Sequence, residues 1–253
     1  MLKQIGKVLT TSLIAIIGCA AVHAAETRGI VESFSCNYLA GKDQRDLDKA
    51  VKFWQQSVDK INSPTLNSYF ATVLQPIRST TDFDFFWLGA NPNLNSWAKS
   101  SSDYVNSKEG QAADARFAKM SKCTSNMYFS EPLHVGLTPS GDADGAVMIA
   151  AGCTLKKGKT MRDVMAAEAP RIKQSKAANT ASSIYRLTPY IANTPIDVVY
   201  LIVYQDLESL GKIGTMQLTS KDWMATGGKF AETMECNSGL YSTNIVHMPP
   251  NPS

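Results

Sequence analysis

The stretch Cys123-Thr-Ser-Asn-Met-Tyr128-Phe-Ser-Glu-Pro-Leu-His134 is matched 113 residues later by Cys236-Asn-Ser-Gly-Leu-Tyr241-Ser-Thr-Asn-Ile-Val-His247. The two stretches share a cysteine, a serine, a tyrosine and a histidine in one register, and the chain has only 3 histidines in 253 residues. The same offset relates Asp84-Phe-Phe-Trp-Leu88 to Asp197-Val-Val-Tyr-Leu201. These matches indicate an internal repeat, which has to be recognised before any fold can be assigned.

The repeat extends towards the N-terminus with a slightly different offset. A shift of 117 residues relates Cys36 to Cys153 and Gly41 to Gly158. Each half then has the same predicted order of elements, strand-helix-strand-strand-helix-strand. The predicted strands before the matched stretches cover residues 30–39, 69–78 and 83–88 in the first half, and 146–155, 184–192 and 196–204 in the second.

The order β-α-β-β-α-β, found twice, is the ferredoxin-like plan of an α+β protein. We therefore predict a signal sequence at 1–24, a first ferredoxin-like repeat at 25–135, a linker at 136–145 and a second repeat at 146–253. The linker is rich in glycine, proline and aspartate, as expected of a connecting loop. The polar segment 89–106 is expected to be an exposed loop or a lid, because serine and asparagine dominate it.

Two such repeats in one chain resemble the dimeric α/β-barrel superfamily in its fused, single-chain form. The resemblance covers nearly the whole mature chain and rests on element order and duplication. It implies two sheets that face each other around a shared barrel, and a monomer that is an internal pseudo-dimer. Some members of the superfamily use a histidine or tyrosine in a cavity without a metal, and others bind haem. No cofactor is expected from this chain's own residues, with haem as the alternative that the resemblance leaves open.

Four cysteines lie outside the predicted signal sequence. Duplication predicts one disulfide within each half, Cys36–Cys123 and Cys153–Cys236. The ferredoxin-like strand order 4-1-3-2 agrees, because it places the end of the first strand beside the start of the fourth. A zinc site is the alternative, but no two of these cysteines form a CxxC pair.

The N-terminus predicts export. Lys3 and Lys7 precede a short apolar region, and Val22-His23-Ala24 fits a cleavage site after Ala24. Lipidation at Cys19 is the alternative, because Ile16-Ile17-Gly18-Cys19 resembles a lipobox. In either case we expect a location outside the cytoplasm, in the periplasm, and no membrane-spanning segment in the mature chain.

The composition excludes some classes of protein. Hydrophobic residues make up 44% of the chain and its formal net charge is +3. The chain is therefore too apolar to be disordered, and it lacks the basic excess of a nucleic-acid-binding protein. None of the common catalytic or phosphate-binding motifs occurs.

Strand alternation suggests the candidate site. The faces of the first strands that do not carry cysteine are lined by small or polar residues, including Asn37. By the same alternation Tyr128, His134, Tyr241 and His247 share the non-cysteine face of the last strands, although Pro132 interrupts one of them. These five residues are our ligand-binding candidates, and a purely structural role is the alternative.

Two classes of function follow. The first is an exported protein without catalytic activity that binds a small ligand or has a structural role. The second is a cofactor-independent or haem-dependent enzyme of the dimeric α/β-barrel type.

Overall fold

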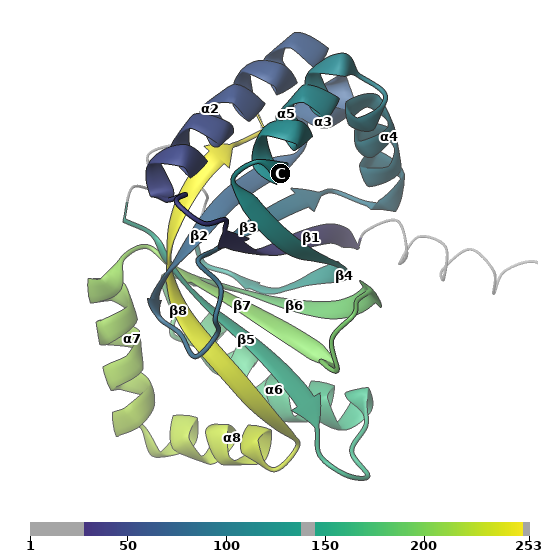
Figure 1. Cartoon of the computed structure of the whole chain (residues 1–253). Coiled ribbons are helices and arrows are strands. Elements are labelled where there is room, and N and C mark those ends of the chain that lie inside the picture. Colours follow the sequence, from purple (N-terminus) through teal and green to yellow (C-terminus); the bar gives the residue numbers. More distant parts are fainter. Residues whose placement is uncertain (1–27, 138–144, 250–253) are drawn as a thin grey trace, which may run out of the picture.

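The computed structural model describes residues 28–137 and 145–249 (Figure 1). The predicted signal sequence, Cys19 and most of the predicted linker lie outside these ranges. Among the described residues, no helix is both long and apolar enough to cross a membrane.

Eight strands of the described residues form a closed barrel, and every neighbouring pair is antiparallel. The strands are β1 (Gly29–Tyr38), β2 (Phe70–Arg78), β3 (Phe85–Asn91), β4 (Ser121–Val135), β5 (Val147–Leu155), β6 (Ser182–Ile191), β7 (Val198–Tyr204) and β8 (Met234–His247). Around the barrel their order is β1-β3-β2-β8-β5-β7-β6-β4. The strands β4-β1-β3-β2 of the first half are thus contiguous, as are β8-β5-β7-β6 of the second half, and each set has the expected order 4-1-3-2.

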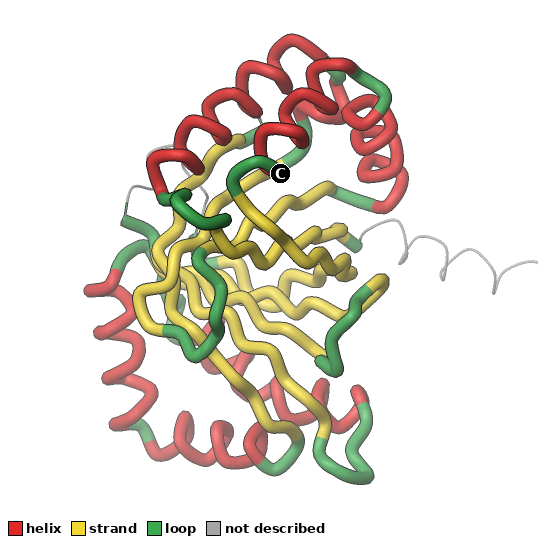
Figure 2. The backbone as a smooth tube through the Cα atoms, in the orientation of Figure 1, coloured by secondary structure: helices red, strands yellow, loops and turns green. Residues whose placement is uncertain are grey.

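The helices form one layer over each half of the barrel, so the barrel is enclosed between two helical layers (Figures 1 and 2). The first layer contains α2 (Gln44–Ile61), α3 (Pro64–Asn67), α4 (Leu94–Val105) and α5 (Lys108–Ala118). The second layer contains α6 (Met161–Ala177), α7 (Leu207–Thr219) and α8 (Lys221–Ala231).

The hydrophobic core is divided by the barrel wall. Inside the barrel, Leu74, Leu88, Leu187, Leu201 and their neighbours form one cluster. Outside it, the apolar stripe of α2, which includes Leu47, Val51, Trp54 and Val58, packs on the first half of the sheet. Burying one face of an amphipathic helix in this way is the main source of its stability.

The last strand of each half crosses into the other half. β4 starts beside β1 and ends beside β6, and β8 starts beside β5 and ends beside β2. Near its end each strand has an irregular register, at Leu133 in β4 and at Val246 in β8. Such a bulge inserts one extra residue, here Val246 or Leu133, and changes the direction of the side chains from that point. Val246 joins the core beneath α2, and Leu133 packs against the core beneath α6.

The expectation of a loop or lid over 89–106 is wrong. The segment completes β3 and then forms α4, which begins after Asn93, whose side chain accepts a hydrogen bond from Ser96 N at 2.9 Å. An N-cap of this kind stabilises the first turn of a helix that is rich in serine. In the second half Asp206 caps α7 in the same way.

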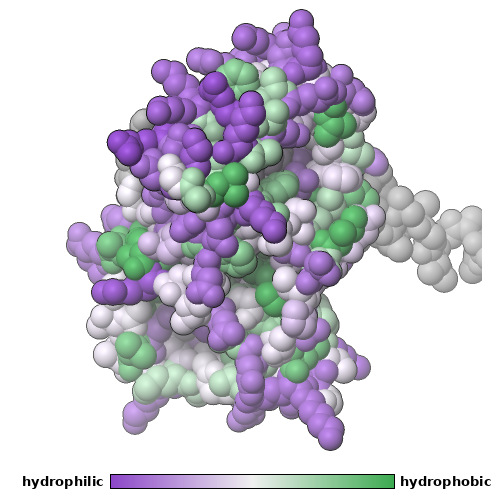
Figure 3. Space-filling view, in the orientation of Figure 1, coloured by the Kyte–Doolittle hydropathy of each residue, from purple (hydrophilic) through white to green (hydrophobic). Residues whose placement is uncertain are grey.

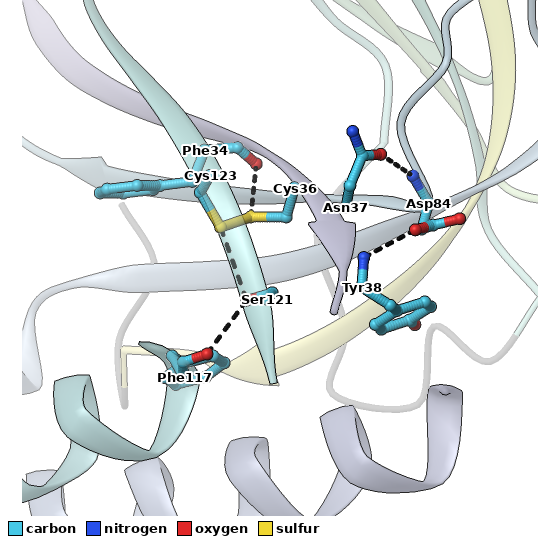
Figure 4. The surroundings of a disulfide bond; sticks show 8 residues. All are labelled: Phe34, Cys36, Asn37, Tyr38, Asp84, Phe117, Ser121 and Cys123. Atoms are coloured by element: carbon cyan, nitrogen blue, oxygen red, sulfur yellow. Dashed lines mark hydrogen bonds between the residues drawn. A yellow bond between two sulfur atoms is a disulfide. The ribbon is translucent and has the colours of Figure 1, made fainter. Parts of the chain in front are cut away.

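Both predicted disulfides are present. Cys36 bonds Cys123 and Cys153 bonds Cys236, in each case between directly opposed residues of neighbouring strands. Figure 4 shows the first of these bonds, with the side chain of Ser121 beside it donating to the carbonyl of Phe117.

An aspartate just before β3 and another just before β7 bind the ends of β1 and β5, respectively. The Asp84 carboxylate accepts from Tyr38 N, and the Asp197 carboxylate accepts from Leu155 N, both at 2.7 Å. Each half therefore contains a disulfide at the same place in its sheet, with an equivalent aspartate hydrogen bond next to it.

Candidate functional site

The first helical layer encloses a cavity of about 470 Å³ against the outer face of β1, β3 and β4. We call it the sheet–helix cavity. Most of its wall is apolar and aromatic, and a few polar groups converge on it, which is the usual character of a small-molecule site. It is lined by Glu32, Phe34, Cys36, Trp54, Leu66, Tyr69, Phe85, Trp87, Ser100, Ser101, Tyr104, Val105, Asp114, Phe117, Ala118, Ser121 and Cys123.

Glu32 places a carboxyl group inside this cavity. It lies on β1 between the apolar residues Ile30 and Phe34, on the face that carries Cys36 and packs under the helices. Burial raises the pKa of Glu32, and the indole of Trp97 in α4 partly opposes this increase. A carboxyl group whose pKa is raised in a cleft is a candidate for proton transfer.

The floor of the cavity is a cluster of aromatic rings that includes one hydrogen bond. The Trp87 indole N–H donates to the Tyr69 hydroxyl at 3.1 Å, and Trp54 packs edge-on against Trp87 with 4.8 Å between ring centroids. The Tyr69 hydroxyl lies directly over Gly89, where an added Cβ atom would overlap it. Glycine is therefore required at this position so that the tyrosine ring can lie on the sheet.

A second carboxyl group, that of the exposed residue Asp114, also lines the cavity. Asp114 of α5 accepts a hydrogen bond from the Tyr104 hydroxyl of α4 at 2.9 Å. Burial raises the pKa of Asp114, and the Tyr104 hydroxyl partly offsets that effect. The pair joins the two helices that close the cavity.

The second half has different chemistry at the matching positions. Counted from the matching cysteines of the two halves, Ile149 takes the place of Glu32 and Gly227 that of Asp114. The helical layer there covers a buried ion pair instead, Arg186 with Glu168, and Glu168 also accepts from the Tyr200 hydroxyl at 2.8 Å.

A second cavity of about 560 Å³ occupies one end of the barrel interior. We call it the barrel cavity. Tyr128 and Tyr241 both line it, as strand alternation predicts, and so do Ser33, Ser35 and Thr154. The Tyr241 hydroxyl is 3.0 Å from the Ser79 hydroxyl, and burial raises the pKa of Tyr128.

The other candidates lie elsewhere. His134 is buried with its Nε2 atom 3.1 Å from both the hydroxyl and the carbonyl oxygen of Thr180, and His247 packs on Trp54. Neither histidine lines the barrel cavity, because the bulge before it alters the alternation on which the shared face depended. Asn37 is exposed near the end of β1, and its side chain accepts from Asp84 N at 3.2 Å, just before β3.

Sequence reasoning missed Glu32 and Asp114. They are distant in the sequence and belong to different kinds of element, so no spacing pattern connects them. One signal was present: Glu32 is a charged residue on the strand face that otherwise carries Ile30, Phe34 and Cys36. A charge on a face destined for the core usually indicates a partner or a function.

The surface agrees with a site that lies below the helices. Figure 3 shows hydrophilic residues over the outer faces of the upper helices, and hydrophobic residues in the hollowed part of the surface between the two layers. In the part of the chain that the structure describes, no group of three or more histidine, cysteine, aspartate or glutamate side chains could hold a metal ion.

Solved structures of other proteins have the same fold. A suspected monooxygenase from Lactobacillus acidophilus matches with a TM-score of 0.59 and 8% identity, over 88% of this chain and 97% of that one. An anthrone oxidase-like protein matches with a TM-score of 0.54 and 11% identity, over 90% and 97% of the two chains. A haem-binding protein from Thermus thermophilus matches with a TM-score of 0.52 and 11% identity, over 85% and 91%.

These likenesses define the fold class. The chain has the fold of the dimeric α/β-barrel superfamily, in a single-chain form. No protein-family model and no curated protein matches the sequence.

Proposed function

We propose that this protein binds a small, mainly apolar molecule in the sheet–helix cavity, and that Glu32 is the acid–base group of that site. The observation that carries the proposal is a half-buried carboxyl group in an aromatic cavity, without a salt-bridge partner among the described residues. A purely structural role would give no reason to keep such a group, because burying it costs free energy.

An enzymatic role agrees with this chemistry better than binding alone. A carboxyl group with a raised pKa exists partly as the acid and partly as the base closer to neutral pH, so it can give or accept a proton in a reaction. The suspected monooxygenases and the anthrone oxidase-like protein of the same fold support an enzyme of this general type. We therefore propose a reaction that begins with transfer of a proton between Glu32 and the bound molecule.

Haem fits these cavities poorly. Among the residues that line either cavity there is no histidine or methionine to bind iron, and the cysteines are joined in disulfides. The same lining residues include no lysine or arginine that could pair with the propionate groups. Burial raises the pKa of Tyr69, Tyr104 and Tyr128, which opposes the phenolate form that would bind iron.

Replacing Glu32 tests the proposal. A library of small aromatic compounds is screened by thermal shift and tryptophan fluorescence, because Trp54 and Trp87 line the cavity. Compounds that bind should lose affinity in E32Q, whereas Y241F, which changes the barrel cavity, should leave their affinity unchanged. Ligands that bind only through the barrel cavity, or no ligands at all, would refute the assignment.

Export and duplication are part of the proposal. Two disulfides support an oxidising location outside the cytoplasm, and we propose the periplasm, reached through the signal at 1–24 or by lipidation at Cys19. We further infer that residues 25–135 and 146–253 are two ferredoxin-like repeats joined by a linker at 136–145. Their matching strand order and disulfides support this origin. The closed barrel supports a monomer.

The barrel cavity is the second candidate site. Tyr128 and Tyr241 line it, and hydroxyl groups surround them, so it suits an uncharged polar ligand. For His134, His247 and Asn37 a role in binding stays a prediction.

A further inference from the structure

The charged residues that line the sheet–helix cavity are all acidic. Its ionisable lining residues other than tyrosine are Glu32 and Asp114, and the lining includes no lysine, arginine or histidine. A nearby carboxylate attracts a positive charge and repels a negative one, and the effect grows as water is excluded. An anionic molecule would therefore meet uncompensated repulsion in this cavity.

Aromatic rings line the same space. Trp54, Tyr69 and Trp87 form the floor, and Phe117 lies on the side of α5, where its ring centroid is 5.7 Å from that of Trp87. The face of an aromatic ring is negative, so several rings around a cavity attract an ammonium group within about 6 Å. Aromatic faces combined with a carboxylate are the recurring way in which proteins bind organic cations.

We propose that the ligand of the sheet–helix cavity is an organic cation, an aromatic or alkyl amine in its ammonium form, whose positive group lies between Glu32 and the rings of Trp54, Tyr69 and Trp87. This inference rests on the proposed function and adds the chemical class of the ligand. The apolar remainder of the amine occupies the space lined by Phe34, Phe85 and Phe117.

Cation binding also accounts for the state of the two carboxyl groups. Burial raises the pKa of both Glu32 and Asp114 in the free protein, and neither carboxyl group forms a salt bridge with a described residue. A bound ammonium group supplies that partner and favours the charged form. Binding therefore releases protons from the protein, and affinity for the cation rises with pH while these carboxyl groups lose their protons.

The second half of the molecule supplies an internal comparison. There the positions of Glu32 and Asp114 are held by Ile149 and Gly227, which carry no charge. The buried Glu168 already has a cationic partner in Arg186. The uncompensated carboxyl groups thus occur in the half that has the aromatic cavity.

Three probes of one shape test the proposal. 2-Phenylethylammonium, 2-phenylethanol and 3-phenylpropionate share an aromatic body and differ in charge, and their binding is measured by calorimetry at low ionic strength. The ammonium compound should bind at least about tenfold more tightly than the alcohol, and the carboxylate should bind more weakly than the alcohol. In buffers of different ionisation enthalpy, the ammonium compound alone should show proton release.

Variants test whether Glu32 and Asp114 cause the preference for the ammonium compound. E32Q should reduce the preference for the ammonium compound over the alcohol to within about threefold, with D114N giving a smaller reduction. E235Q is the matched control, because it removes one carboxylate from the lining of the barrel cavity and should leave the preference unchanged. Circular dichroism and melting temperature establish that each variant is folded.

The possible failures are distinct. If the alcohol binds as tightly as the ammonium compound and E32Q weakens both, the proposed binding site stands and the cationic ligand is refuted. If a preference for the ammonium compound survives in the E32Q/D114N double variant, the assignment to these carboxyl groups is wrong. If none of the three probes binds, both the cationic ligand and the proposed function are overturned.

Discussion

His247, at the end of β8, packs edge-on against Trp54 of α2, with 5.9 Å between the ring centroids and 82° between the ring planes. The histidine belongs to the second half of the chain and the tryptophan to the first. The contact therefore fastens the last strand under the helices of the opposite half. His134 makes the corresponding link in the other direction, to Thr180.

The first prediction concerns this contact. Burial lowers the pKa of His247 from its ordinary value of 6.5, so the folded state favours the neutral ring. The stability that depends on the neutral ring is complete above pH 6.5 and is lost as the pH falls through the lowered pKa. H247F keeps an aromatic ring and removes the titration, so its free energy of unfolding should fall less steeply with acid. Urea unfolding between neutral and acidic pH measures this difference. If the free energy of unfolding falls equally with acid in H247F and in the wild type, the prediction is refuted.

The second prediction concerns the disulfides. The bonds span 87 and 83 residues, so loop closure predicts that removing either one as a double serine variant costs about 4–5 kcal/mol. Denaturant unfolding measures the cost. Wild-type protein unfolded in the presence of a reductant, which breaks both disulfides, is the comparison. The two variants should differ in function, because only Cys36–Cys123 lines the sheet–helix cavity. Equal loss of ligand binding in both variants would contradict that distinction.

The third prediction concerns the position under Tyr69. In G89A a methyl group would overlap the tyrosine hydroxyl, so the ring must move and its hydrogen bond with Trp87 must weaken. We expect a loss of about 2–3 kcal/mol in the free energy of unfolding and a shift in tryptophan fluorescence. G214A is the control, because nothing lies within 4 Å of the added atom in α7. There alanine should stabilise the helix by up to about 1 kcal/mol. Similar effects in both variants would show that the ring does not constrain the sheet.

The fourth prediction separates the two cavities. Y128F and Y241F each remove a hydroxyl group from the barrel cavity, and Tyr241 loses its contact with Ser79. Each variant should lose about 1 kcal/mol of stability and keep its affinity for ligands of the sheet–helix cavity. Thermal shifts with uncharged polar compounds should decrease in both if the barrel cavity binds such molecules. A tyrosine variant that instead weakened amine binding would show that the cavities are not independent.

The fold could be predicted because rare residues recurred in register. Cys36 and Cys123, matched by Cys153 and Cys236, predicted the pairing of both disulfides, and neighbouring strands bring each pair together. α4 could not be predicted by the same reasoning. Its serines and asparagines resemble a loop, and its stability depends on the cap at Asn93 and on packing against the sheet, where Ser100 is buried.

The site was harder to predict for two physical reasons. Strand alternation correctly placed Tyr128 and Tyr241 in the barrel, but a single bulge residue in each long strand separated the histidines from them. The sheet–helix cavity depends on the approach of a strand and two helices, so Glu32 and Asp114 come to line one cavity only in the folded chain. Periodicity within one element carries no information about such an encounter.

The ion pair of Arg186 and Glu168 has a consequence for how this molecule could have changed. When a barrel is assembled from two identical chains, any substitution appears twice, so a cavity cannot be opened in one subunit and filled in the other. In this single chain each half is encoded separately, so a substitution can occur in one half alone. In this chain the helical layer of one half covers a salt bridge, while that of the other half covers the cavity lined by Glu32. A single-chain barrel thereby permits a division of labour, in which the half with the salt bridge acts as scaffold and the half with the proposed site acts as receptor.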